Sequence, residues 1–92
     1  MKLRIIVYAP TAVEQFIYRF NRENITKVKF IKSEVIDGTP FVTVDDNNIS
    51  KELLFDFAYR LGTLQKDLAI KGESWLPLKD YPFPPKEDEF NQ

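Results

Sequence analysis

The chain contains no cysteine and no histidine among its 92 residues. Without cysteine there is no disulfide framework, no thiolate nucleophile and no thiolate metal site. Without histidine the chain also lacks the commonest general base and metal ligand of proteins. These absences predict a non-enzymatic protein that binds no metal and no cofactor and is held together by packing alone. A cysteine-free domain suits a reducing compartment, so we expect a cytoplasmic location.

An excess of charge of one sign and long apolar runs are missing as well. The 13 basic and 14 acidic residues give a net charge of −1, so no global field draws the protein onto nucleic acid or an anionic membrane. No apolar stretch approaches the roughly 18 residues of a membrane span, and residues 1–10 lack a signal-peptide cleavage pattern. We therefore expect no membrane partner, and nucleic acid is disfavoured.

The first half of the chain predicts a strand, a helix and a hairpin. Residues 3–8 alternate as a strand with apolar side chains on both faces, which is typical of a strand at the centre of a sheet. Helical spacing of apolar residues follows over residues 13–20. Asp37-Gly38 is the signal of a tight type I′ turn, which would join strands over residues 26–36 and 41–44. For a regular hairpin Phe30 faces away from the core, whereas a β-bulge would reverse its face.

The second half of the chain adds one long helix and a C-terminal segment that is neither helix nor regular strand. An amphipathic pattern runs to about Ile70, with Asn48 or Ser50 as its N-cap and Gly72 as its end. The order strand, helix, strand, strand, helix predicts an α+β fold, a ferredoxin-like two-layer sandwich whose fourth strand is short or absent. We assign residues 1–72 to this domain. Residues 73–92 are rich in proline and aromatic residues and form an extended tail that packs on the domain or on a partner.

A ferredoxin-like order places both helices on one sheet face and leaves the other face open. That open face is predicted to carry apolar residues, which a protein rarely exposes to water. We expect the tail either to pack across it or to complete an interface with a second chain. The hypothesis is therefore a regulatory or interaction protein that binds another protein, or itself as a homodimer. The predicted protein-binding residues are aromatic: Tyr8, Phe30, Phe41, Trp75, Tyr81 and Phe83.

Three alternatives start from other features of the sequence. A ligand-sensing module of the ACT type has the same strand order, but the glycine-rich turns of such modules are missing here. A single-stranded RNA-binding domain would use the lysines around Phe30, which equally suit a solvated edge strand. The acidic and amide residues at 45–48 could bind calcium, but they lack the turn glycine and closing carboxylate of a calcium loop, so helix capping explains them better.

Overall fold

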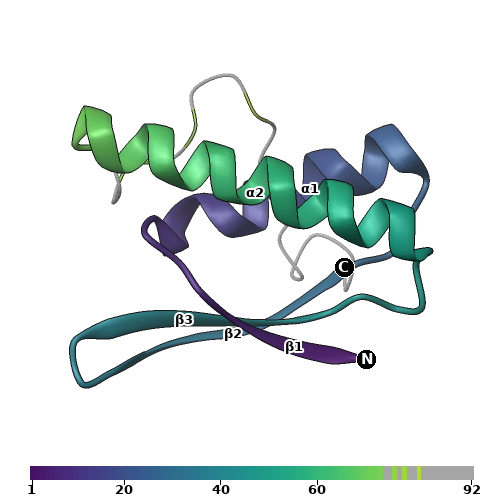
Figure 1. The fold of residues 1–92 in the computed structure, drawn as a ribbon, viewed down its shortest axis with the longest axis horizontal. Coiled ribbons are helices and arrows are strands. Elements are labelled where there is room, and N and C mark those ends of the chain that lie inside the picture. The colour runs from purple at the N-terminus through teal and green to yellow at the C-terminus, as the bar shows by residue number, and fades with distance from the viewer. Residues whose placement is uncertain (74–75, 77, 79–80, 82–92) are drawn as a thin grey trace, which may run out of the picture.

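The computed structural model describes residues 1–73 together with Leu76, Leu78 and Tyr81. Within these residues the chain forms a three-stranded antiparallel sheet and two α-helices, which confirms the predicted α+β class (Figure 1). In chain order the elements are strand β1 (Lys2–Ile6), the short 3-10 helix η1 (Pro10–Ala12), helix α1 (Val13–Asn24), strands β2 (Lys29–Ile36) and β3 (Thr39–Asp45), and helix α2 (Lys51–Lys71).

The strand order among the described residues is β1-β3-β2, so in this part of the chain β3 is the central strand and β1 lies at an edge. The prediction that the first strand is central is therefore wrong. The prediction assumed that a strand with apolar side chains on both faces is buried on both faces. In the structure one face of β1 packs on the core, whereas Ile6 on the other face is 64% exposed.

The turn between β2 and β3 is formed by Asp37 and Gly38, as predicted, and both have positive φ angles, of 51° and 79°. The ladder then shifts register at a β-bulge between Phe30 and Lys32, so that Phe30 pairs with Val44. Val44 belongs to the buried core, and Phe30 packs against that core. Of the two predicted placements of Phe30, the one with a β-bulge, in which Phe30 faces the core, is therefore the correct one, and Phe30 does not lie on the open face as a binding residue.

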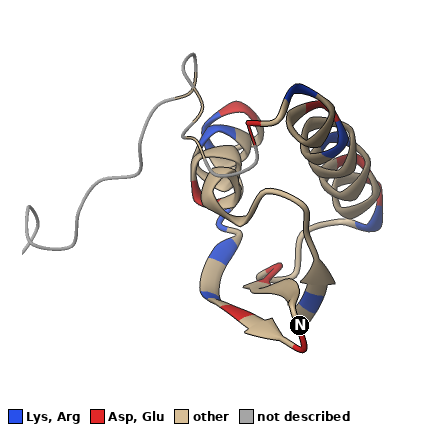
Figure 2. Ribbon diagram, turned by 90° about the vertical axis from the view of Figure 1, so that its left-hand side faces the viewer, with Lys and Arg blue, Asp and Glu red and all other residues tan. Residues whose placement is uncertain are grey.

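Both helices cover the same face of the sheet, and no described helix or strand covers the opposite face, called the open face below (Figures 1 and 2). The core between the layers contains the rings of Phe16 and Phe20 from α1 and of Phe57 from α2. The Phe57 ring meets the other two edge-on, at centroid distances of 5.3 and 5.1 Å. Leu61 is buried beside them. Leu54, on the same face of α2, is only half-buried because it borders a groove.

Two buried glutamines connect irregular segments to the helices. The side chain of Gln65 on α2 accepts a hydrogen bond from the Ala9 amide and donates one of 2.9 Å to the Ala9 carbonyl. On α1, Gln15 accepts from the Leu78 amide at 2.8 Å and donates to the carbonyls of Leu78 and Tyr81 at 3.1 and 3.3 Å. Each side chain therefore satisfies buried backbone groups outside the sheet and helix ladders.

Two described residues of the C-terminal segment, Leu78 and Tyr81, pack on the helical layer. Leu78 is 8% exposed and belongs to a small apolar cluster with Ala12 and Leu68. The Arg19 guanidinium lies 4.3 Å from the centroid of the Tyr81 ring. For these residues the prediction that the segment covers the open sheet face is wrong, because the buried glutamine of α1 and the apolar cluster hold them on the helical layer.

Ile25, directly after α1, has a backbone conformation that suits its side chain poorly. Its φ of 54° and ψ of 48° are left-handed, which costs a β-branched residue roughly 1–2 kcal/mol, and its side chain is 94% exposed. We expect Ile25→Gly to raise the free energy of unfolding by about 1 kcal/mol, because glycine adopts this conformation without steric cost. Urea unfolding measures the change. The matched control, Val35→Gly, removes an exposed β-branched residue from a strand and should lower stability; a loss in both variants would contradict the explanation.

Candidate functional site

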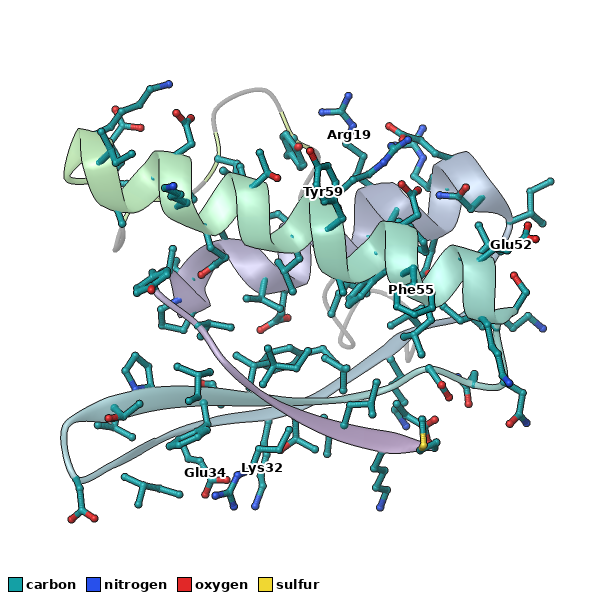
Figure 3. All side chains as sticks on the ribbon, viewed as in Figure 1. Arg19, Lys32, Glu34, Glu52, Phe55 and Tyr59 are labelled. Atoms are coloured by element: carbon teal, nitrogen blue, oxygen red, sulfur yellow. The ribbon has the colours of Figure 1, made fainter. Side chains whose placement is uncertain are left out.

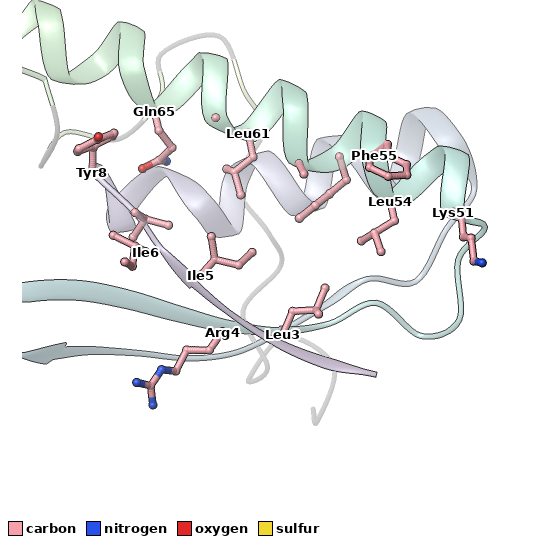
Figure 4. A pocket seen from close by; sticks show the side chains of 14 residues that line it. Leu3, Arg4, Ile5, Ile6, Tyr8, Lys51, Leu54, Phe55, Leu61 and Gln65 are labelled. Carbon is pink, nitrogen blue, oxygen red and sulfur yellow. The ribbon is translucent and has the colours of Figure 1, made fainter.

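An apolar groove of about 540 Å³ runs between β1 and α2 (Figure 4). Leu3 and Ile5 on the strand lie opposite Leu54 and Leu61 on the helix. All of its lining residues come from β1 with the loop after it, or from α2. The two elements are separate in the sequence, so the groove is a product of the tertiary arrangement.

The free edge of β1 borders this groove. The Met1 carbonyl accepts from the Asp46 amide and the Val7 amide donates to β3, each at 3.1 Å, which marks hydrogen-bonded pairs at both ends of the β1–β3 ladder. Such pairs alternate along an antiparallel ladder, so the odd-numbered residues of β1 bond to β3. The N–H and C=O groups of Arg4 and Ile6 therefore point away from β3. Among the described residues, no strand pairs with this edge.

Three large side chains on the groove are exposed to solvent. Ile6 and Tyr8 are 64% and 66% exposed, and Phe55, near the start of α2, is 77% exposed. Phe55 and Tyr8 lie toward opposite ends of the groove (Figure 4). Together with the apolar walls they make a contiguous apolar surface, the kind of feature that marks an interaction site.

The chemistry of the groove favours recognition of an apolar partner over catalysis. Among the described residues that line it, only Arg4 and Lys51 carry a charge, and both are cationic. The side-chain amide of Gln65 is already bonded to Ala9. The volume lies within the roughly 300–1,000 Å³ of small-molecule sites, but such sites have convergent free polar groups that fix a ligand, and this groove offers few.

The open face of the sheet is more polar than its predicted composition suggests. The Arg4 guanidinium lies 4.7 Å from the centroid of the Phe41 ring and covers this half-buried aromatic residue. Lys32 and Glu34 project from the same face and form an ion pair of 3.7 Å (Figure 3). These contacts lower the apolar area that this face presents to a partner.

The predicted binding residues do not form one surface. Tyr8 lines the groove, while Phe41 lies on the open face and Phe30 in the core. Tyr81 is half-buried against α1 and α2, in contact with Arg19. Two of the predicted residues lie outside the described part of the chain: Trp75 and Phe83.

Sequence reasoning missed the α2 side of the groove, including Phe55, Ala58 and Gly62. Two signals were present. Phe55 is apolar but falls outside the buried stripe of the helix, and Gly62 interrupts a helix interior where alanine would be more stable by about 1 kcal/mol. Neither signal identifies the facing element, because that depends on the strand order.

Asp45 and Asp46 stabilise the turn that leads into α2. Their carboxylates accept hydrogen bonds from the amides of Asn47 and Asn48 at 2.9 and 3.1 Å, and the Met1 ammonium lies 3.3 and 2.9 Å from them. The Asn47 amide is the main cause that lowers the pKa of Asp45, and the Met1 ammonium is the main cause for Asp46. Asp46 in turn raises the pKa of the ammonium. Within the described residues, no group of three candidate metal ligands comes together.

Comparisons with known proteins give no assignment for this chain: no protein-family model, no curated protein and no solved structure matches it. In the described part of the chain, neither helix has the length and apolar character needed to cross a membrane. The proposals below therefore depend on the groove and on the edge of β1.

Proposed function

We propose that this chain is a non-enzymatic cytoplasmic interaction protein that binds another protein through the groove between β1 and α2. The observation that supports this function is the coincidence of an apolar groove with an unpaired strand edge and three exposed apolar side chains, Ile6, Tyr8 and Phe55. Exposed apolar surface is unfavourable in water, and a bare strand edge promotes unwanted pairing. Their presence together is therefore typical of an interaction site. The absence of cysteine and histidine from the sequence supports a binding role and a reducing compartment.

We further propose that the fold is a ferredoxin-like sandwich without its last strand. In that fold the fourth strand lies beside the first, which then becomes central. The order β1-β3-β2 with both helices on one face supports this interpretation. The groove under α2 is then the place that a fourth strand would fill.

Affinity capture from an extract of the source cells tests the proposed function. The double variant Tyr8→Ser with Phe55→Ser removes two exposed aromatic side chains of the groove. The control, Ile70→Ser, removes an apolar side chain of the same helix that is 75% exposed and does not line the groove. We expect a protein that is retained by the unmodified chain and by the control but lost, by about tenfold or more, with the double variant. Identical retention by all three baits would contradict the proposal.

Binding of single-stranded nucleic acid is a second candidate, favoured by the basic side chains and Phe41 on the open sheet face. Stacking of bases needs a free aromatic ring, and Arg4 covers this one. Lys32 is already paired with Glu34. Retention on single-stranded RNA that falls steeply with salt and is lost in Phe41→Ala would favour this function over protein binding.

A further inference from the structure

We propose that the groove binds a single extended segment of another protein, which pairs with β1 as a fourth strand. This inference rests on the proposed function and specifies its binding mode. In strand addition, backbone hydrogen bonds supply affinity, and pockets for alternate side chains supply specificity. Both components are present here, because the outward backbone groups of Arg4 and Ile6 lie beside the apolar groove.

The two edges of the sheet differ in a way that favours pairing at β1. The edge strand β2 contains a β-bulge at Ile31 and the exposed residues Lys29 and Lys32, which are common protections against unwanted pairing. β1 pairs with β3 in regular register along its whole length. A regular edge without a bulge is a competent template for a further strand.

Gly62 gives the groove the depth that a strand needs. It lies in the interior of α2 and lines the groove, and no described atom lies within 4 Å of the position that a Cβ would take. Packing against the described residues therefore does not explain a residue that destabilises a helix. Its neighbour on the groove, Ala58, is also small. Together they let a bound backbone and its inward side chains approach α2 closely.

The side chains around the edge define the chemistry of the bound segment. Every second residue would point into the groove between Ile5 and Leu61, and should be a medium-sized apolar residue. The intervening residues would lie on the open face beside Arg4 and Lys2, and one end of the segment would lie near Lys51. Opposite charges across paired strands are favourable, so the segment should be acidic at these positions.

A second copy of the chain fits this place poorly. α2 lies along the free edge of β1, over the place of an added strand. In a symmetric β1–β1 pair each copy would bring its own α2 over the same two strands, and the two helices would need the same space. An isolated strand from another protein brings no such helix.

The C-terminal segment of the chain itself is also a poor match. Tyr81 lies against Arg19 and Arg60, on the opposite side of α2 from the groove. The next residues include Pro82, Pro84 and Pro85, which cannot donate to a ladder. In residues 86–92 only Phe90 is a large apolar residue, so the alternation that the groove requires is missing.

The test selects a displayed library of random short peptides on the full 92-residue chain. We expect enrichment of sequences in which apolar β-branched residues alternate with polar ones and acidic residues occur at the alternate positions. The variant Gly62→Leu should bind the selected peptide about tenfold or more weakly while unfolding at a higher urea concentration, because leucine fills the groove and favours the helix. Weaker binding by a more stable protein is not the result of a folding defect. Selection of basic, proline-rich or helix-patterned peptides, or no enrichment, would overturn the proposal.

Hydrogen exchange of the amides of β1 tests the pairing itself, with an internal control. The Ile5 and Val7 amides bond to β3 and should exchange slowly with or without the peptide. The Arg4 and Ile6 amides should exchange fast in the free chain and slowly in the complex. Slow exchange of these two amides in the free chain would overturn the proposal: if independent of protein concentration it would indicate the chain's own C-terminal segment, and if dependent on it a second copy.

The two proposals fail in different ways. If no captured protein depends on Tyr8 and Phe55, the proposed function is wrong. If such a protein exists but its binding leaves the exchange of the Arg4 and Ile6 amides unchanged, the groove binds a partner by another mode, and only strand addition is wrong.

Discussion

Replacing Phe57 with alanine is expected to lower the free energy of unfolding by about 3–5 kcal/mol. The ring is 2% exposed and is in contact with the rings of Phe16 and Phe20, so its removal leaves a cavity between the two helices and the sheet. Domains of this size have a total stability of roughly 5–15 kcal/mol, so the variant should be largely destabilised. Urea unfolding followed by circular dichroism measures the difference.

The matched control is Phe55→Ala, which makes the same substitution on the same helix. Phe55 is 77% exposed, so its replacement should change the free energy of unfolding by less than about 0.5 kcal/mol. If the two variants lose similar stability, the core does not lie where the structure places it.

Ending the chain after Glu73 is expected to cost about 2–4 kcal/mol of stability. The truncation removes the buried side chain of Leu78, a contact of roughly 1.5–3 kcal/mol, and the interaction of the Tyr81 ring with Arg19, of about 0.5–1 kcal/mol. Glu73 is kept because its amide bonds to the Leu68 carbonyl and ends α2. The exposed apolar cluster should also promote self-association, which analytical ultracentrifugation would detect.

A chain that ends after Tyr81 is the control for this truncation. It keeps the Leu78 and Tyr81 side-chain contacts and both backbone carbonyls, of Leu78 and Tyr81, that accept hydrogen bonds from the Gln15 side chain. We expect its unfolding midpoint to equal that of the full chain. Equal losses in both truncated chains would show that residues after 81 carry the stability, and an unchanged midpoint in both would show that the whole segment contributes none.

Local features of the sequence were sufficient to predict most of the secondary structure. Ser50 accepts a hydrogen bond from the Leu53 amide and begins α2, and Gly72 ends it with a φ of 72°, as their residue types predict. The Asp37-Gly38 turn follows from the same reasoning, because few residues adopt positive φ angles. These features depend on neighbours along the chain, which the sequence states directly.

Part of the candidate site was also visible in the sequence. Tyr8 was predicted as a binding residue because it is aromatic and was placed on the open face of the first strand; in the structure it follows β1 and lines the groove. The face of Phe30 could not be decided from the sequence, because a bulge of one residue reverses the direction of the side chains before it, and bulges have no strong sequence signal. The roles of Gln15 and Gln65 were missed, since a glutamine that satisfies buried backbone groups looks like any surface residue.

The sequence by itself determined the α+β class, the two helices, the tight hairpin and the lack of thiol and imidazole chemistry. Only the tertiary structure decided that β1 is an edge strand among the described residues, that a groove lies between β1 and α2, and that Leu78 packs against η1 and α2. The physical reason is the separation along the chain of the residues that interact. Caps, turns and helical periodicity arise from interactions within a few residues, whereas strand order and side-chain partners depend on contacts between distant segments. The periodicity of β1 shows which side chains are apolar, but not whether its free backbone groups have a partner.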